Sequence, residues 1–134
     1  MTLGWSADIE SATLANETFR TVLFTGKHTQ LTVMHLQPGE EIGLEAHDEI
    51  DQFIRIESGL ARVTMGSSKE TVDETHELED DWAVMIPAGV WHNVINVGNE
   101  PLKLYSLYSP PEHPDGTVHA TKADADAAEA AHGH

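Results

Sequence analysis

Residues 87–96 read PAGVWHNVIN, and this stretch decides the fold of the chain. Pro87 and Gly89 are turn residues, because proline fixes one backbone angle and glycine accepts conformations that other residues avoid. The residues that follow are β-branched, aromatic and apolar, which favours a strand. The turn therefore feeds His92 into the start of an apolar strand, where an imidazole can act as a metal ligand if other donors face it.

The donors that could face His92 lie in residues 39–52. Glu45 and His47 are two positions apart, which places both side chains on one face of a strand, whereas they would diverge on a helix. Gln52 follows after a short corner, and a hairpin there brings its amide beside the pair. Asp51 is the rival ligand if the corner is one residue tighter.

The chain has no cysteine, so any metal must be held by histidine, carboxylate, amide or water. Two imidazoles, one carboxylate and one amide oxygen suit a borderline divalent ion such as Mn, Fe, Co, Ni or Zn. We therefore predict a site for one such ion, with the ligands Glu45, His47, Gln52 and His92. Positions left open on the ion would let it polarise a carbonyl or bind an enediolate or carboxylate.

Short apolar and β-branched runs recur along the chain and are separated by turn residues. We predict strands at 18–25, 30–36, 52–56, 60–65, 83–86, 90–97 and 102–108. Many short strands with turns between them indicate an all-β sandwich or barrel. No helical period is found before residue 120. After a stiff loop that begins at Pro110, a short helix is predicted over 122–131, with Thr121 as its cap.

The two segments that carry the predicted ligands resemble the two motifs of the cupin family. The residues that match motif positions are Gly39, His47, Gly59, Pro87, Gly89, His92 and Asn96. Three positions depart from the motifs: Glu45 takes the place of the first histidine, Gln52 that of the glutamate, and Asp81 that of the leading glycine. The resemblance covers roughly residues 30 to 110.

The resemblance implies a double-stranded β-helix, the cupin or jelly-roll barrel, with a short C-terminal helix or tail. Residues 1–28 would supply N-terminal strands, 29–110 the barrel with its metal site, and 111–134 a Pro-rich loop and an acidic helical tail. The ligand set is similar to that of the phosphomannose-isomerase branch, with Gln and Glu in the opposite order. The chain is too short for that enzyme, so its activity does not transfer. Small cupins are often dimers, which implies a homodimer.

Further side chains are expected around the site. In the family fold His28 and Gln30 lie on a strand beside it. One of Tyr105 and Tyr108 is expected to reach the pocket while the other packs in the core. Strand alternation from Gln52 places Arg55 on the opposite face. For His113 and His119 we expect exposed loop positions, the alternative being that they fold over the barrel mouth. Asn96 is expected to bond to backbone rather than to metal.

The charge of the chain restricts the classes of molecule that it is expected to bind. Acidic residues outnumber basic ones 23 to 7, and the net charge of −16 argues against nucleic acid, because a phosphate backbone would be repelled. No stretch approaches the ~20 apolar residues of a membrane span. The first ten residues lack the pattern of a signal peptide. We therefore expect a soluble, cytoplasmic protein whose partner is a small molecule.

Three functions remain open from the sequence. The first is an enzyme that isomerises or enolises a small oxygenated substrate, such as a sugar or keto acid, with Glu45 as ligand or general base. A dioxygenase is its variant if the metal is iron. The second is a module that binds metal and a small ligand without turnover. The third is a cupin that has lost its metal.

Overall fold

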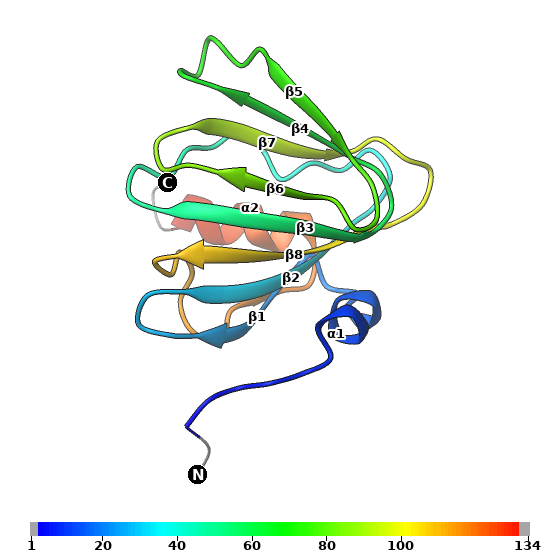
Figure 1. Ribbon diagram of the computed structural model, residues 1–134, viewed down its shortest axis with the longest axis vertical. Coiled ribbons are helices and arrows are strands. Elements are labelled where there is room, and N and C mark those ends of the chain that lie inside the picture. The colour runs from blue at the N-terminus through cyan, green and yellow to red at the C-terminus, as the bar shows by residue number, and fades with distance from the viewer. Residues whose placement is uncertain (1–2, 132–134) are drawn as a thin grey trace.

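Two antiparallel sheets face each other in the computed structural model, which describes residues 3–131 (Figure 1). The strands are β1 Arg20–Thr25, β2 Gln30–Leu36, β3 Asp51–Ser58, β4 Ala61–Gly66, β5 Glu74–Leu78, β6 Ala83–Ile86, β7 Trp91–Asn96, β8 Leu102–Ser109 and β9 Val118–His119. The helices are α1 Ile9–Ala15 and α2 Lys122–Ala131. Within the described part of the chain the larger sheet has the order β6-β3-β8-β2-β1-β9, and the smaller has the order β5-β4-β7.

The expected all-β fold with a short C-terminal helix is confirmed, and α2 has the predicted bounds. The expectation that no helix precedes residue 120 was wrong. Helix α1 begins after Asp8, whose carboxylate accepts a hydrogen bond from the Ser11 amide, and it buries only Thr13. Seven residues with one buried position give no apolar period. Strand β5 was also missed, because four of its five residues are exposed.

Strands from both flanks of the predicted barrel segment join the larger sheet. β1 pairs with β2 on one side and with β9 on the other, so segments before residue 29 and after residue 110 belong to the same sheet as the middle of the chain. Between residues 3 and 131, no helix is both long and apolar enough to span a membrane.

The inner face of the larger sheet changes from apolar to polar along its strands. At one end, which we call the apolar end, the buried residues Met34, Leu36, Ile56, Leu102 and Leu104 pair across β2, β8 and β3. At the other end the register aligns Gln30 with Tyr108 and Tyr108 with Gln52, all three buried. We call these three residues the polar row. Because side chains alternate along strands, both ends face the same interior.

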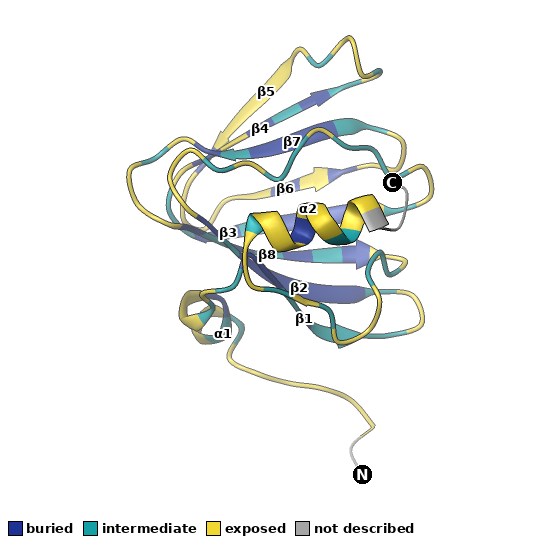
Figure 2. Cartoon of the chain, turned by 180° about the vertical axis from the view of Figure 1, so that it is seen from behind, coloured by how far each residue is buried: buried dark blue, intermediate teal, exposed yellow. Residues whose placement is uncertain are grey.

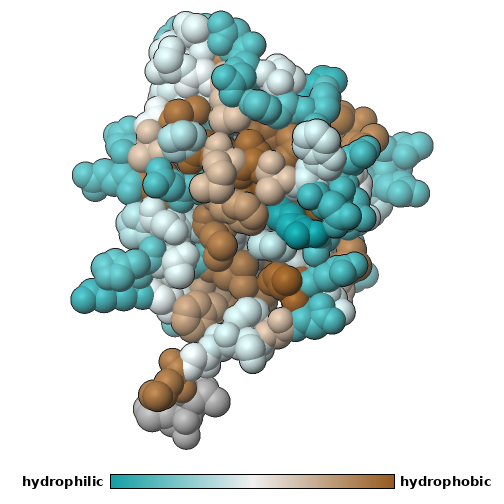
Figure 3. Space-filling view, in the orientation of Figure 1, coloured by the Kyte–Doolittle hydropathy of each residue, from teal (hydrophilic) through white to brown (hydrophobic). Residues whose placement is uncertain are grey.

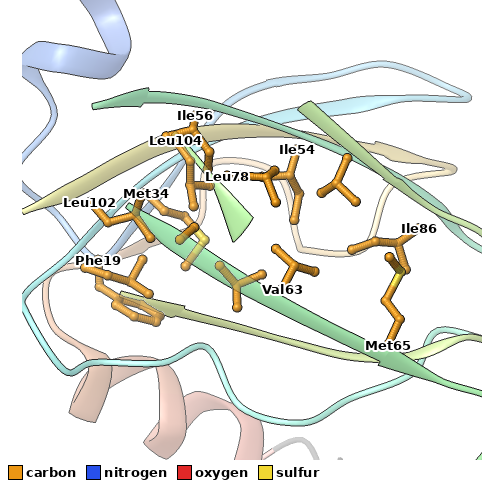
Figure 4. Close-up of a cluster of buried hydrophobic side chains, with 14 of the residues drawn as sticks. Phe19, Met34, Ile54, Ile56, Val63, Met65, Leu78, Ile86, Leu102 and Leu104 are labelled. Carbon is orange, nitrogen blue, oxygen red and sulfur yellow. The ribbon is translucent and has the colours of Figure 1, made fainter. Parts of the chain in front are cut away.

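The core fills the space between the sheets (Figure 4). Helix α2 lies across the face of the larger sheet that is turned away from the viewer in Figure 1, as Figure 2 shows. Its Ala125 is buried and joins the core cluster, and the Lys122 ammonium lies 5.9 Å from the ring centroid of Phe19. Among the described contacts of this largely exposed helix are thus a buried alanine and a cation–π contact.

The outer face of the larger sheet carries a continuous apolar band (Figure 3). The register places one outward-facing residue from each of β1, β2, β3, β6 and β8 in a single row. We call this row the apolar stripe: Phe24, Leu31, Phe53, Met85 and Leu107. Met85 is 61% exposed. Leu31, within the stripe, is 8% exposed.

Two tight turns explain how the chain matches and departs from the cupin motifs. Gly59 has φ +96°, and a Cβ there would lie 2.8 Å from the Pro101 carbonyl oxygen, so a side chain is excluded. Asp81, which stands where the motif has glycine, adopts φ +73°. Aspartate tolerates this left-handed conformation better than most residues, so the turn survives the replacement.

Candidate metal centre

His92 and Glu45 are held side by side by the backbone. His92 lies on β7 and pairs with Met65 of β4. An isolated bridge joins it to Glu45, with backbone hydrogen bonds of 2.9 and 2.8 Å between the two residues. The amide of Gly89, in the turn before β7, donates to the His47 carbonyl at 2.8 Å. Two segments more than forty residues apart are thus fastened together, as the predicted site requires.

The side chains of these residues converge on one carboxylate. Oε1 of Glu45 lies 3.3 Å from Nε2 of His47 and 3.7 Å from Nε2 of His92. The ligand atoms of the three residues all lie within 4.8 Å of one another. The predicted trio is therefore brought together in one place, with His92 only 2% exposed.

Both imidazoles present the nitrogen that a metal would need. Nδ1 of His92 lies 3.0 Å from the Val90 carbonyl oxygen, which can only accept, so this nitrogen carries the proton. Nδ1 of His47 lies 3.4 Å from a carboxylate oxygen of Glu112. The two Nε2 atoms are buried and have no hydrogen-bond partner among the described residues. Partners on Nδ1 that leave Nε2 open are the usual support of metal-bound histidine.

The charge of Glu45 fits the same picture. Burial raises the pKa of the Glu45 carboxyl, but the neighbouring imidazoles of His47 and His92 outweigh it, so that this pKa lies well below its ordinary value. Burial lowers the pKa of His47, and its carboxylate neighbours Glu45 and Glu112 raise it above the ordinary value. Glu45 is therefore an anion at neutral pH and can serve as a ligand without first losing a proton.

Gln52 faces the interior from the opposite sheet. It is 2% exposed, and its Oε1 is buried without a hydrogen-bond partner in the part of the chain that the structure describes. Its neighbour Asp51 is exposed and accepts a hydrogen bond from the Ala88 amide at 2.9 Å. Strand alternation thus assigns the inward position to Gln52 and turns Asp51, the rival ligand, toward the turn. Ligation by Gln52 stays a prediction.

Of the two tyrosines on β8, Tyr108 reaches the site. Its ring meets that of His47 edge-on, with centroids 6.2 Å apart. Burial raises the pKa of Tyr108 to about 12, so its hydroxyl stays protonated. Tyr105 lies on the outer face against Phe53, with ring centroids 6.2 Å apart. The expectation that the second tyrosine packs in the core was therefore wrong. Arg55 also faces outward, as predicted, and pairs there with acidic residues.

The Pro-rich loop folds over the barrel mouth, which overturns the exposed position expected for His113. Nε2 of His113 is buried, and its ring meets Tyr108 edge-on at 5.2 Å. Gln30 of the polar row holds the loop: its Oε1 accepts from the amides of Glu112 and His113 at 3.2 and 2.9 Å, and its Nε2 donates to the His113 carbonyl at 2.7 Å. His28, expected beside the site, is exposed in the turn between β1 and β2.

Sequence reasoning missed Glu112, which orients His47 from this loop. The proline content indicated a stiff loop but not its direction. Asn96 behaves as predicted, since its amide donates to the carbonyl oxygens of Leu36 and Glu100 and accepts from Gly98. A cavity of about 350 Å³ opens beside the trio. Its lining includes Glu45, His47, Trp91, Glu112 and Glu129.

The nitrogen and oxygen donors of this site are chemically suited to a divalent ion. Two buried imidazole nitrogens and one buried amide oxygen have no hydrogen-bond partner in the described chain, and the Glu45 carboxylate lies 3.3 and 3.7 Å from the two nitrogens. Buried polar atoms left without partners are costly unless a ligand satisfies them. Nitrogen and oxygen donors in this combination suit a borderline transition metal.

Residues 32–108 match the family model Cupin_2, described as a cupin domain. The chain belongs to the cupin family. The expected double-stranded β-helix is confirmed by this family match and by the solved structures similar to the chain. One of them, BH2720 from Bacillus halodurans, is 53% identical to this cupin with a TM-score of 0.91. The match covers 92% of this chain and 93% of that chain.

Two curated proteins are also similar to this cupin. The uncharacterized protein YrkC of Bacillus subtilis (strain 168) is 60% identical over 122 residues, which is 91% of this chain and 66% of YrkC. The uncharacterized protein L612 of Acanthamoeba polyphaga mimivirus is 43% identical over 112 residues, 83% of this chain and 68% of L612. The chain thus spans about two thirds of the length of the curated relatives it matches.

Proposed function

We propose that this cupin holds one divalent transition metal, Mn, Fe, Co, Ni or Zn, and uses it to bind and polarise a small oxygenated molecule. The proposed ligands are Glu45, His47, Gln52 and His92. The observation that carries the proposal is the pair of buried Nε2 atoms that have no hydrogen-bond partner among described residues and converge on the Glu45 carboxylate. The fourth donor, Oε1 of Gln52, is likewise buried and unsatisfied.

The chemistry proposed for the site is enolisation or isomerisation of a sugar or keto acid. A bound divalent ion supplies Lewis acidity toward a carbonyl or enediolate oxygen. The set of two histidines, one glutamate and one glutamine is similar to that of the phosphomannose-isomerase branch of cupins, which supports this class. Tyr108 keeps its hydroxyl proton and lies against His47, so it can donate a hydrogen bond near the site.

The second candidate is a module that binds metal and ligand without turnover. The low pKa of the Glu45 carboxyl favours it, because a carboxylate of such low basicity is a weak general base at neutral pH. Glu45 then acts as ligand only. A dioxygenase would require the ion to be iron. Identification of the bound metal as another element would exclude this activity.

Metal analysis of untagged protein tests the site itself. We expect near-stoichiometric metal in the wild type and less than a tenth of it in His47→Ala and His92→Ala. The matched control is His76→Ala, because His76 also lies beside a glutamate, with Nε2 2.7 Å from Glu74, but on the exposed strand β5. Equal metal content in all four proteins would remove the proposal.

Turnover separates the enzyme from the binding module. The metal-loaded protein is assayed on a panel of sugars, keto acids and diketones. Turnover that disappears in Glu45→Gln supports the enzyme. Ligand binding without any turnover on the panel supports the module.

We further propose that the cupin forms a homodimer through the apolar stripe. The stripe runs across five strands and carries no charge, whereas the chain as a whole has a net charge of −16. Two such copies repel one another except where uncharged surface meets uncharged surface. Light scattering should show a dimer for the wild type and a monomer for Leu107→Lys, and an unchanged mass for that variant would contradict the interface.

A further inference from the structure

Arg20 is a buried cation with no carboxylate partner among the described residues. It lies on β1 and is 7% exposed. Its Nε is buried and has no hydrogen-bond partner, and no ion pair joins it to a carboxylate within residues 3–131. Its remaining contacts are weak: Nη1 lies 3.4 Å from Nδ1 of His119, and Cζ lies 5.4 Å from the ring centroid of Phe19. A buried guanidinium is normally paired, because removing it from water is costly.

The two other arginines of the chain differ from Arg20 because they form ion pairs with carboxylates. Arg55 pairs with Glu57 at 3.0 Å and with Asp81 at 2.7 Å. Arg62 pairs with Glu77 at 2.8 Å. Both side chains are far more exposed than Arg20, at 37% and 46%. In a chain with 23 acidic residues the exposed arginines have carboxylate partners, and the buried one has none among the described residues.

Arg20 lines a cavity of about 400 Å³ next to the candidate metal centre. His113 and His119 line it as well, and His119 is the cross-strand neighbour of Arg20 in the register of β1 and β9. Nε2 of His113 is the second buried atom at this cavity without a hydrogen-bond partner in the described residues. A guanidinium Nε and an imidazole Nε2 that have no hydrogen-bond partner among the described residues and share one cavity indicate a site for an oxygen-bearing anion.

The cavity adjoins the one beside the metal trio. Glu112 and Glu129 line both cavities. The rings of His113, Tyr108 and His47 follow one another edge-on from the Arg20 side toward Glu45, with centroid distances of 5.2 and 6.2 Å. A small molecule anchored at Arg20 therefore lies in the neighbourhood of the proposed metal.

We propose that the Arg20 cavity binds the carboxylate of a small organic acid, with Arg20 as its counter-ion, and thereby selects acids over neutral sugars. The selection of a substrate rests on the proposed function; the binding of the carboxylate does not. A monoanion is favoured over phosphate, because one guanidinium shares the cavity with the carboxylates of Glu112 and Glu129, which repel a dianion more strongly.

Calorimetry on the metal-free chain tests the proposal with 2-oxobutanoate and, as its uncharged counterpart, 2-oxobutanamide. The acid should bind and the amide should bind at least tenfold more weakly. Arg20→Met should weaken binding of the acid by about tenfold to a hundredfold, which is the usual range for a lost charge-assisted hydrogen bond. The matched control Arg62→Met removes an exposed, paired guanidinium and should leave binding unchanged.

A thermal melt separates a binding role from a structural one. Because Arg20→Met replaces an unpaired buried charge by an apolar side chain of similar length, it should melt no lower than the wild type. If that variant fails to fold, Arg20→Lys keeps the charge and loses the planar fork, and it should bind the acid more weakly than the wild type. Equal binding of acid and amide, full binding by Arg20→Met, or tighter binding of inorganic phosphate would overturn the proposal.

The two proposals fail separately. The calorimetric measurement uses protein without metal, so binding of the acid at Arg20 can succeed when metal analysis finds no metal. Near-stoichiometric metal combined with no binding of the acid would leave the metal centre standing and remove the Arg20 site.

Discussion

The two ends of the same barrel strands use opposite chemistry. At the apolar end Leu36 pairs with Leu102, and both are fully buried. At the other end the polar row sets Gln30, Tyr108 and Gln52 in an equally buried position. The register between β2 and β8 is unbroken from one end to the other, so along this pair of strands the difference lies in the side chains.

This cupin gains stability at the apolar end and gives up stability at the polar row. Buried apolar side chains contribute about 1.5–3 kcal/mol each. Buried polar atoms without partners, such as Oε1 of Gln52 and the two Nε2 atoms of the metal trio, oppose folding. Such a concentration of unsatisfied atoms at one end is expected of a binding site, where a ligand completes the missing contacts.

The largest effect should come from the apolar end. Leu102→Ala removes a side chain with 0% exposure and leaves a cavity between the sheets. We expect a loss of about 2–5 kcal/mol in the free energy of unfolding. Urea denaturation of the metal-free protein measures it. A loss below about 1 kcal/mol would show that this end does not carry the stability assigned to it.

At the polar row, a substitution should raise the free energy of unfolding instead of lowering it. Gln52→Leu replaces an amide whose oxygen has no described partner by an apolar side chain of similar size. The metal-free protein should gain about 1 kcal/mol, while metal affinity falls by roughly tenfold to a hundredfold. Denaturation and metal titration test the two halves. A variant that loses stability and keeps its metal affinity would show that Gln52 is structural.

A smaller loss of metal affinity is expected from Glu112→Gln. The amide oxygen still accepts from Nδ1 of His47 but no longer carries the charge that favours this arrangement. Metal affinity should fall by about tenfold. Glu74→Gln, which alters the exposed contact with His76, is the control and should have no effect. NMR of the His47 ring nitrogens reports whether Nδ1 keeps its proton.

The pH dependence of stability should trace His113. Burial, with the nearby Arg20 charge, lowers the pKa of His113 from 6.5 to about 3. Between these values the unfolded chain binds the proton and the folded chain does not, so stability falls as pH drops from 6.5 toward 3. In His113→Gln the decline should be shallower by at most about 1.4 kcal/mol per pH unit. Parallel curves for both proteins would contradict the buried position of the ring.

The smallest effect is expected at the turn beside the apolar end. Asp81→Gly relieves the positive φ of +73° but removes the ion pair with Arg55 at 2.7 Å. The two terms are each within about 1 kcal/mol and of opposite sign, so the melting temperature should hardly move. Asp81→Ala keeps the strain and loses the pair, and it should be the less stable of the two variants.

Local signals made much of the fold predictable. The β-branched runs located β2, β6, β7 and β8 to within a residue or two, and the cap at Thr121 located α2. The spacing of Glu45 and His47 and the turn before His92 predicted the trio that the structure brings together. Each of these signals lies within ten residues of sequence, which is the range that strand alternation and turn chemistry control.

The rest depends on contacts that no local pattern encodes. Gln30 binds His113 across 83 positions, and this contact turns the loop over the barrel mouth. The burial of Arg20 likewise depends on tertiary structure, because β1 lies between β2 and β9. From the sequence alone, a short run with one arginine is typical of an exposed strand end. The sequence predicted the inner trio, while its surroundings emerged only from the tertiary structure.

The contact made by Gln30 has a consequence for how this barrel can change. Its amide also donates to Oγ1 of Thr25 on β1, but its described hydrogen bonds to the loop are all with main-chain atoms: it accepts from two N–H groups and donates to one carbonyl. Main-chain atoms are the same whatever side chains the loop carries. The loop can therefore exchange Glu112 or His113 for other residues and stay anchored. Substitutions in this loop can thus change which small molecule the barrel binds without changing how the loop is attached.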